Sequence, residues 1–466
     1  MPRTLPHRLS PGLALLLVLL ALQLGACGGY AQRMASVHDR VDRADVSGAL
    51  GTIDQLVGRA EDGRSPEKHD LPLLLLERGA LLQAAGNHDA AVQDFTAADQ
   101  MMEMLDLTPD GFSAAARYLF SDDLTLYRPP VYEKLMINLL AMSSFLHLGR
   151  TSSARVEARR ARVLIEFFQS TEFADHPMIG AANYLIGVAS EVAGDRSSAL
   201  LFYRDAWRVA PAPGLAESLV RLSHGTPQAR SAEVLEARQH LGLGPDDPPP
   251  AAREEIIVLG FSGLAPRRQA ERFPVGVVYA WIATGDGVAL TSEQQAQYNR
   301  IMADGLLTWV NYPILTRVEN RVRGFDVSAS GHSGALDHLA DIESFALEEW
   351  DRQKGGIAAA AITRAITRVV AREAVRAGGR AAGVDDALFP GASWLIGAAV
   401  QGGMQAADRP DTRGWTTLPA HIHVGRIPVT PGEHTVRVQP RGASGAREFT
   451  VTVPEGGQRV IVLRTL

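Results

Sequence analysis

Two patterns of hydrophobic and polar residues divide the chain near residue 243. Between Val41 and Leu241, apolar residues recur at the spacing of amphipathic helices, in segments rich in Ala, Leu, Arg and Glu. After residue 254, β-branched and aromatic runs bounded by Gly and Pro replace that pattern. The sequence therefore predicts an α+β fold, with an all-α N-terminal half and a mixed α/β C-terminal half that ends in a small antiparallel β-module.

A proline-rich segment, residues 243–253, separates the two halves. Proline fixes φ and lacks an amide hydrogen, so neither a helix nor a central strand is expected there. We predict these units: a leader over 1–26, a helical domain over 27–242, the linker over 243–253, a mixed strand and Ala/Arg-rich helix domain over 254–410, and the β-module over 411–466.

The helical half contains an internal repeat. Two sets of residues share the same offsets, and a third is degenerate: Gly79, Gly86, Ala91, Phe95 and Ala98; Gly187, Gly194, Ala199, Tyr203 and Ala206; Met142, Gly149, Ala154, Ala158 and Ala161. We interpret each set as two antiparallel helices that pack closely at small residues. The middle glycine ends the first helix, and the aromatic residue fills the gap between the two.

This pattern resembles the tetratricopeptide repeat at its small-residue positions, although the copies are spaced by 63 and 45 residues rather than the usual 34 or so. Arg78 also stands where the repeat usually has Leu. A chance match of Ala-rich hairpins is the alternative. The resemblance implies a concave face that binds a partner protein, and by repeat geometry it places these residues there: Gln83, Ser143, Tyr184 and Glu191.

In the second half we expect strands at residues 255–262 and 275–283, one or two more within 315–330, and a helical block over 333–382. The chain closes with four alternating segments separated by turns, at residues 422–429, 433–438, 447–453 and 459–464. They predict a small antiparallel sheet, which resembles the PEGA-type β-modules of surface proteins.

Five arginines fall four apart on the predicted helix and form a basic stripe: Arg364, Arg368, Arg372, Arg376 and Arg380. An acidic block precedes them, beyond Gly355 and Gly356. One interpretation is that the two blocks pair across a break at these glycines. The other is that the stripe binds anionic lipid headgroups or an acidic partner.

No motif predicts catalysis, a metal site or a cofactor. The segment Gly331–Ala335 lacks the final glycine of a nucleophile elbow, and we predict a turn before a helix with Ser333 as N-cap. His421 and His423 share one face of a strand, but without a third ligand at a recognisable spacing they are interpreted as surface histidines. A net charge of −6 gives no electrostatic case for nucleic-acid binding.

The N-terminus carries the most specific signal. Arg3, His7 and Arg8 precede a short apolar run, which ends in Leu-Gly-Ala before Cys27, the only cysteine of the chain. This arrangement is typical of a bacterial lipobox, so we predict a cleaved signal peptide over 1–26 and a diacyl or triacyl lipid on Cys27. An uncleaved anchor with an incidental cysteine is the alternative. No thiol then remains for disulfides or thiolate metal sites.

Several stretches are together similar to a family of bacterial tetratricopeptide-containing envelope lipoproteins: residues 132–138, 154–160, the Ala/Arg helix, 411–420 and 431–435. The resemblance implies a Gram-negative envelope and no known active site. Gly28 after the cysteine indicates export to the outer membrane. We therefore expect a lipid-anchored, periplasm-facing scaffold that binds another envelope protein. An assembly or export factor, or a peptidoglycan-acting enzyme with its site in residues 251–466, is the alternative.

Overall fold

The computed structural model describes residues 30–466 except 64–65, 103–126, 128, 252–253, most of 279–308 and 382–410. For residues 66–67, 213, 360 and 363–381 only the backbone is described. Cys27 lies outside the described residues. So do the side chains of the basic stripe, Arg364 to Arg380.

The first half is helical, as predicted. Its α-helices are α2 Tyr30–Asp42, α3 Val46–Glu61, α4 Leu71–Ala85, α5 His88–Met101, α7 Val131–His147, α8 Thr151–Gln169, α9 Pro177–Val192, α10 Arg196–Val209, α11 Pro213–Ser223 and α12 Ala232–His240. Two short 3-10 turns accompany them among the described residues, η1 Pro66–His69 and η3 Pro227–Arg230. Residues 244–251 of the linker contain neither helix nor strand.

The three predicted hairpins are confirmed as the pairs α4/α5, α7/α8 and α9/α10. Each turn contains a glycine at positive φ, with Gly86 at 85°, Gly149 at 70° and Gly194 at 78°. This is the left-handed conformation that ends helices. A Cβ on Gly79 would lie 2.8 Å from Phe95 Cε1, so the ring packs directly on the glycine. The equivalent contact joins Gly187 and Tyr203.

The strands are β1 Glu254–Ser262, β2 Arg267–Pro274, β3 Trp309–Thr316, β4 Phe325–Ala329, β5 His332–Ala335, β6 Asp337–Asp341, β7 His421–Val429, β8 Gly432–Pro440, β9 Arg447–Val453 and β10 Gln458–Arg464. They form an inner sheet in the order β10-β1-β7-β6, an outer sheet in the order β5-β4-β8-β9, and a two-stranded ribbon, β2-β3. Helix α15, Ile342–Ala381, follows β6 directly.

The prediction of a separate antiparallel β-module over 411–466 is wrong. β7 and β10 flank β1 in the inner sheet, with β10 parallel to β1, whereas β8 and β9 extend the outer sheet from β4. The reason is burial. β1 is almost entirely buried, so it needs a hydrogen-bonded partner on both edges. The alternation of apolar and polar residues along the last four strands indicates which side chains face the core, but it does not indicate which strand each one pairs with.

Three local predictions are also wrong. Residues 275–278 are helical, and the strand β2 precedes them in a polar, mostly exposed stretch without alternation. Ser333 lies in β5 after a tight turn at Ser330 and Gly331, both at positive φ. Asp341 is the residue that caps α15, since its Oδ1 accepts a bond of 2.9 Å from the Ser344 amide. That helix runs without a break through Gly355 and Gly356.

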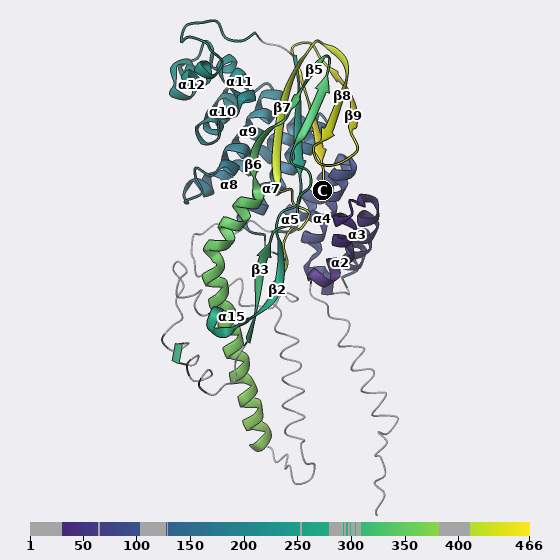
Figure 1. Cartoon of the computed structure of the whole chain (residues 1–466), viewed down its shortest axis with the longest axis vertical. Coiled ribbons are helices and arrows are strands. Elements are labelled where there is room, and N and C mark those ends of the chain that lie inside the picture. The colour runs from purple at the N-terminus through teal and green to yellow at the C-terminus, as the bar shows by residue number, and fades with distance from the viewer. Residues whose placement is uncertain are drawn as a thin grey trace, which may run out of the picture.

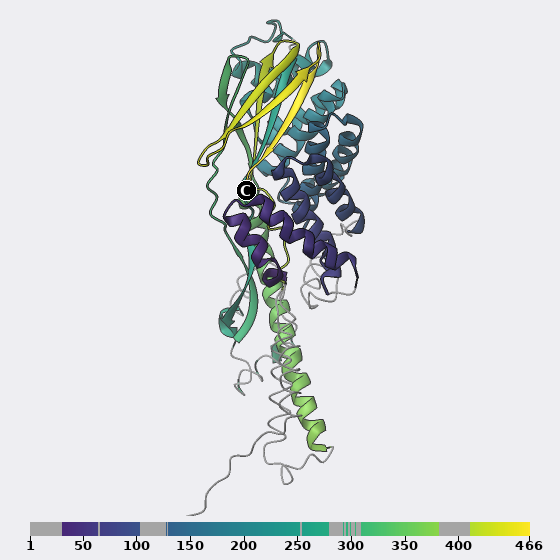
Figure 2. The same cartoon turned by 90° about the vertical axis from the view of Figure 1, so that its right-hand side faces the viewer.

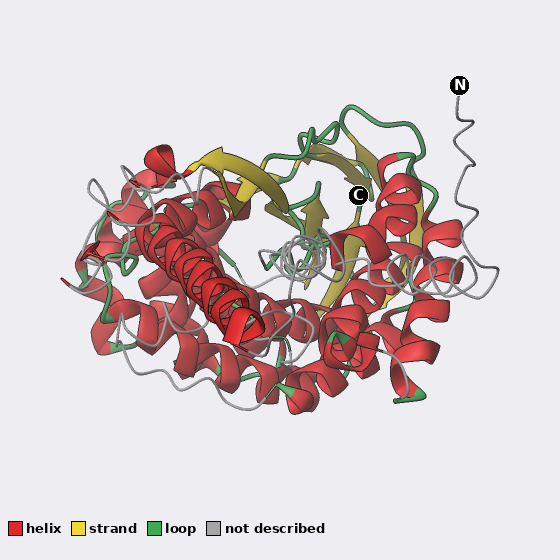
Figure 3. Ribbon diagram, turned by 90° about the horizontal axis from the view of Figure 1, so that it is seen from below, coloured by secondary structure: helices red, strands yellow, loops and turns green. Residues whose placement is uncertain are grey.

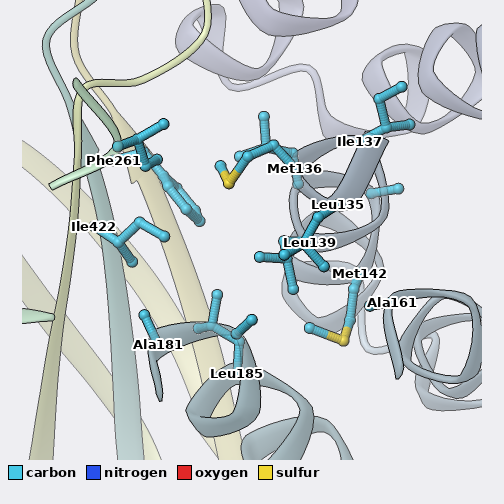
Figure 4. Packing of buried hydrophobic residues seen from close by; sticks show 14 of the residues in the cluster. Leu135, Met136, Ile137, Leu139, Met142, Ala161, Ala181, Leu185, Phe261 and Ile422 are labelled. Carbon is cyan, nitrogen blue, oxygen red and sulfur yellow. The ribbon is translucent and has the colours of Figure 1, made fainter. Parts of the chain in front are cut away.

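The body has three layers, namely the helices, the inner sheet and the outer sheet (Figure 1). Viewed along the long axis, the helices form an arc with the strands on its inner side (Figure 3). Met136 of α7 and Leu185 of α9 face Phe261 of β1 and Ile422 of β7 across the first interface (Figure 4). The second interface is a smaller apolar cluster centred on Phe325 and Val438.

Helix α15 and the β2-β3 ribbon extend away from this body (Figures 1 and 2). The helix has 40 residues, which corresponds to about 60 Å at the usual rise per residue. Among the described residues, no helix is long and apolar enough to span a membrane.

Candidate functional site

The inner face of the helical arc was the predicted partner-binding surface, and the chain itself occupies it. Gln83, Ser143 and Tyr184 are buried, with exposed fractions of 1%, 0% and 1%, and the Glu191 side chain is 6% exposed. A partner protein therefore has no access to these four side chains while the inner sheet is in place. This corrects the expectation of a free concave surface.

Segment Asp411–Ala420 runs through this face without regular secondary structure and is almost entirely buried. Glu77 of α4 holds it: its carboxylate accepts bonds of 2.8 Å from the amides of Thr416 and Thr417, and one of 2.7 Å from the Thr416 hydroxyl. Tyr30 donates a further bond of 3.0 Å. Buried amides outside a helix or sheet need another acceptor. The Glu77 carboxylate therefore accepts the hydrogen bonds that the backbone of a neighbouring strand would otherwise accept from this segment.

Glu133 of α7 is the second buried carboxylate at the segment. It accepts from the Trp415 amide at 3.3 Å and from the Tyr127 hydroxyl. Burial raises the pKa of Glu133, and the nearby Arg268 opposes this. The Trp415 ring is 2% exposed and lies 5.8 Å from the ring of Phe95, the aromatic residue of the first repeat.

Asp70 and Asp411 hold the start of the segment through Arg413. The Arg413 guanidinium lies 3.6 Å from Asp70 and donates a bond of 3.2 Å to Asp411. Burial raises the pKa of Asp70 although Arg33 and Arg413 oppose it. For Asp411, burial is outweighed by Arg413, so its pKa is lowered.

Arg426 of β7 makes a second polar contact between the sheet and the helices. It donates bonds of 2.8 Å to Glu191 of α9 and 2.6 Å to Glu255 of β1. Arg221 adds a bond of 2.7 Å to Glu191. Burial alone would raise the pKa of Glu191, but the two guanidinium groups lower it to about 2, so this carboxylate stays charged.

Arg464, near the end of β10, is fully buried and donates one bond of 3.3 Å to Gln83. Its Nε and Nη2 atoms have no hydrogen-bond partner among the described residues, and burial lowers its pKa to about 9. Beside it, the rings of His88 and His147 stack at 4.0 Å. His147 accepts a bond of 3.1 Å from the Val462 amide.

The histidines singled out in β7 are not both at the surface. His423 is 2% exposed, and its Nε2 lies 3.0 Å from the Ser262 hydroxyl. The ring of His338 in β6 lies 5.3 Å from that of His423 and 5.4 Å from that of His421. Across the described part of the chain, no group of three or more His, Cys, Asp or Glu side chains is arranged to hold a metal ion.

An open cleft of about 480 Å³ adjoins this histidine cluster, between the loop of Asn320 and the start of α15. Glu343 lies in it and is paired with Arg317 at 2.9 Å. Burial raises the pKa of Glu343, and Arg317 opposes the shift. His421 also lines the cleft, and its Nδ1 has no hydrogen-bond partner in the described part of the structure.

Sequence reasoning missed the residues that join the two halves, namely Glu77, Glu133, Arg426 and Arg464. The first two did carry a signal, since Glu77 follows a run of leucines and the Glu133-Lys134 pair stands in a stretch that is otherwise largely apolar.

A search of protein-family models and of curated proteins gives no match to this chain.

Proposed function

We propose that this chain is a lipid-anchored lipoprotein of the Gram-negative outer membrane that faces the periplasm and acts as a non-catalytic scaffold for another envelope protein. The observation that carries this proposal is the stack of helical hairpins, in which α4/α5, α7/α8 and α9/α10 each contact the next. Stacked helical repeats provide the extended surfaces on which many scaffolds hold their partners.

The outward face of α8 and α10 is the surface that fits this role, since the inner face is filled. It exposes Val156, Val163 and Leu201, with exposed fractions of 37%, 51% and 44%. The Arg162 guanidinium lies 5.9 Å from the Phe202 ring and connects the two helices at this face. Exposed apolar side chains with arginine among them are typical of interface cores. A partner with apolar and acidic side chains would complement them.

The proposal is tested by photo-crosslinking in cells. A photoreactive amino acid replaces Val163 on α8, and a matched variant carries it at Thr450, an exposed position of β9 on the outer sheet. We expect the same envelope protein to be crosslinked reproducibly from Val163 and not from Thr450. Absence of a specific adduct at Val163, with the protein present at its normal level in the envelope, would count against a scaffold that uses this face.

A second candidate function is supported by the cleft at Glu343. A buried carboxyl with a raised pKa beside a histidine is an arrangement that enzymes use for proton transfer. A peptidoglycan-acting enzyme would place its substrate there. Incubation of the purified protein with peptidoglycan tests this: release of soluble fragments by the wild type and not by Glu343→Gln would favour the enzyme over the scaffold.

A further inference from the structure

The β2-β3 ribbon carries exposed apolar side chains at its far end. Its register runs from Arg267 opposite Thr316 to Pro274 opposite Trp309. Trp309 is 47% exposed, and Val277, just beyond Pro274, is 42% exposed. The other large hydrophobic residues that are exposed in the described part lie on helices α5, α8 and α10.

A cation accompanies the exposed tryptophan. The Arg272 guanidinium lies 5.9 Å from the centre of the Trp309 ring, and Arg272 is itself exposed. Tryptophan and arginine are both favoured at the interface between lipid and water, because the ring combines an apolar body with a polar edge and the guanidinium pairs with phosphate. We define the ribbon tip as Arg272, Pro274, Val277 and Trp309.

The ribbon is held against the body at its other end. Arg267 pairs with Asp42 at the end of α2, at 2.7 and 3.1 Å. Along α15, the Tyr312 hydroxyl donates a bond of 3.2 Å to the carbonyl of Lys354. The ribbon is therefore supported along its length. α2 and the ribbon lie at the same end of the body, the one from which α15 projects (Figures 1 and 2).

The start of the fold is very close to the predicted lipid. Only Gly28 and Gly29 separate Cys27 from Tyr30, and an extended chain gains at most about 3.6 Å per residue. Tyr30 is 3% exposed and bonded to Glu77, so the fold begins there. A lipid on Cys27 would hold Tyr30, the first residue of α2, within about 10 Å of the bilayer surface.

We propose that the ribbon tip inserts into the headgroup region of the membrane that holds the lipid. This inference rests on the lipid anchor of the proposed function. The ligand is a phospholipid surface: Trp309 and Val277 contact the acyl boundary, and Arg272 contacts phosphate. The contact fixes how the body is oriented on the membrane, which a flexible lipid attachment alone does not do.

Vesicle flotation of unlipidated protein tests the proposal. The sample is residues 28–466, which contain every described element, with vesicles of phosphatidylethanolamine and phosphatidylglycerol. We expect the wild type to float with the vesicles, and Val277→Ser with Trp309→Ser to reduce the partition at least tenfold. The matched control is Val163→Ser with Leu201→Ser, which removes equally exposed apolar side chains from α8 and α10 and should float like the wild type.

Two results would overturn the ribbon contact: the wild type does not float, or the ribbon variant floats like the control. In the second case, loss of flotation in a variant that combines Arg364→Gln, Arg368→Gln and Arg372→Gln would assign the contact to α15 instead. Neither result affects the lipid anchor, which is tested separately by labelling Cys27 with a fatty-acid analogue in cells.

Discussion

Histidine burial should make this protein sensitive to acid, and His423 offers the clearest test. Its ring is 2% exposed in the space between β7 and Phe325. Burial, with the neighbouring rings of His338 and His421, lowers its pKa from 6.5 to about 3. Between these values the unfolded chain binds a proton that the folded chain does not. The free energy of unfolding therefore falls as the pH drops below 6.5.

The size of the effect follows from the same shift. Each pH unit below 6.5 costs about 1.4 kcal/mol per histidine that stays neutral in the fold, so at pH 5.0 His423 should cost about 2 kcal/mol. His88, with a pKa of about 3 for the same reason of burial, should add a similar amount. Carboxyls whose pKa is raised, such as Glu133, increase the free energy of unfolding as the pH falls. Their contribution is the same in the variant and in the wild type, so it cancels when the two are compared.

The measurement is urea unfolding of residues 28–466 at pH 7.5 and at pH 5.0. His423→Gln keeps a polar side chain near Ser262 and removes the titrating group. We expect the loss of stability between the two pH values to be about 2 kcal/mol smaller in this variant than in the wild type. His332→Gln, at an exposed position of β5, is the control and should behave like the wild type. An equal loss in His423→Gln and in the wild type would refute the reasoning.

Three further predictions concern the repeats, the buried carboxylate and the anchor. Ala91→Leu and Ala199→Leu, at positions with no exposed surface, should each lower the free energy of unfolding by roughly 1–3 kcal/mol through overpacking; unchanged urea midpoints in both would mean that these alanines are not at close helix contacts. Glu77→Ala removes the acceptor of the buried amides of Thr416 and Thr417 and should cost about 3 kcal/mol or more. Glu166→Ala, at an exposed pair on α8, should cost less than about 1 kcal/mol, and similar costs for the two variants would argue against the role of Glu77. Cys27→Ser, expressed behind a cleavable secretory leader, should lose the fatty-acid label and leave the membrane fraction in washes with high salt, and retention of the label would place the lipid elsewhere.

The sequence predicted the helical half well because each of its hairpins depends on nearby residues. Gly86 and Gly194 follow α4 and α9, and the second helix of each hairpin begins two residues later. The rings of Phe95 and Tyr203 pack on glycines of the same hairpin. Local spacing therefore contains most of the information that these elements need.

The strands and the inner face depended on residues far apart in the chain. β1 pairs with β7 and β10, and Glu77 bonds to Thr416 and Thr417. Neither pairing leaves a mark on the local alternation of hydrophobic and polar residues, so it could not be predicted from that pattern. The predicted surface of Gln83 and Glu191 was placed on the inner side of the arc by repeat geometry. Only tertiary structure could show that Arg464 and Arg426 already fill that side.

The position of the last strand has a consequence for biosynthesis. β1 obtains both its neighbours, β7 and β10, from the final 46 residues, and segment Asp411–Ala420 covers the helices just before them. During synthesis, the helical arc therefore leaves the ribosome long before the chain that covers it has emerged. During that interval the apolar inner surface is open to water and to other nascent chains, which is the condition under which chaperones act. Truncation of the last strand would remove one hydrogen-bonded neighbour of β1 and would expose the parts of α7 and α4 that β10 covers.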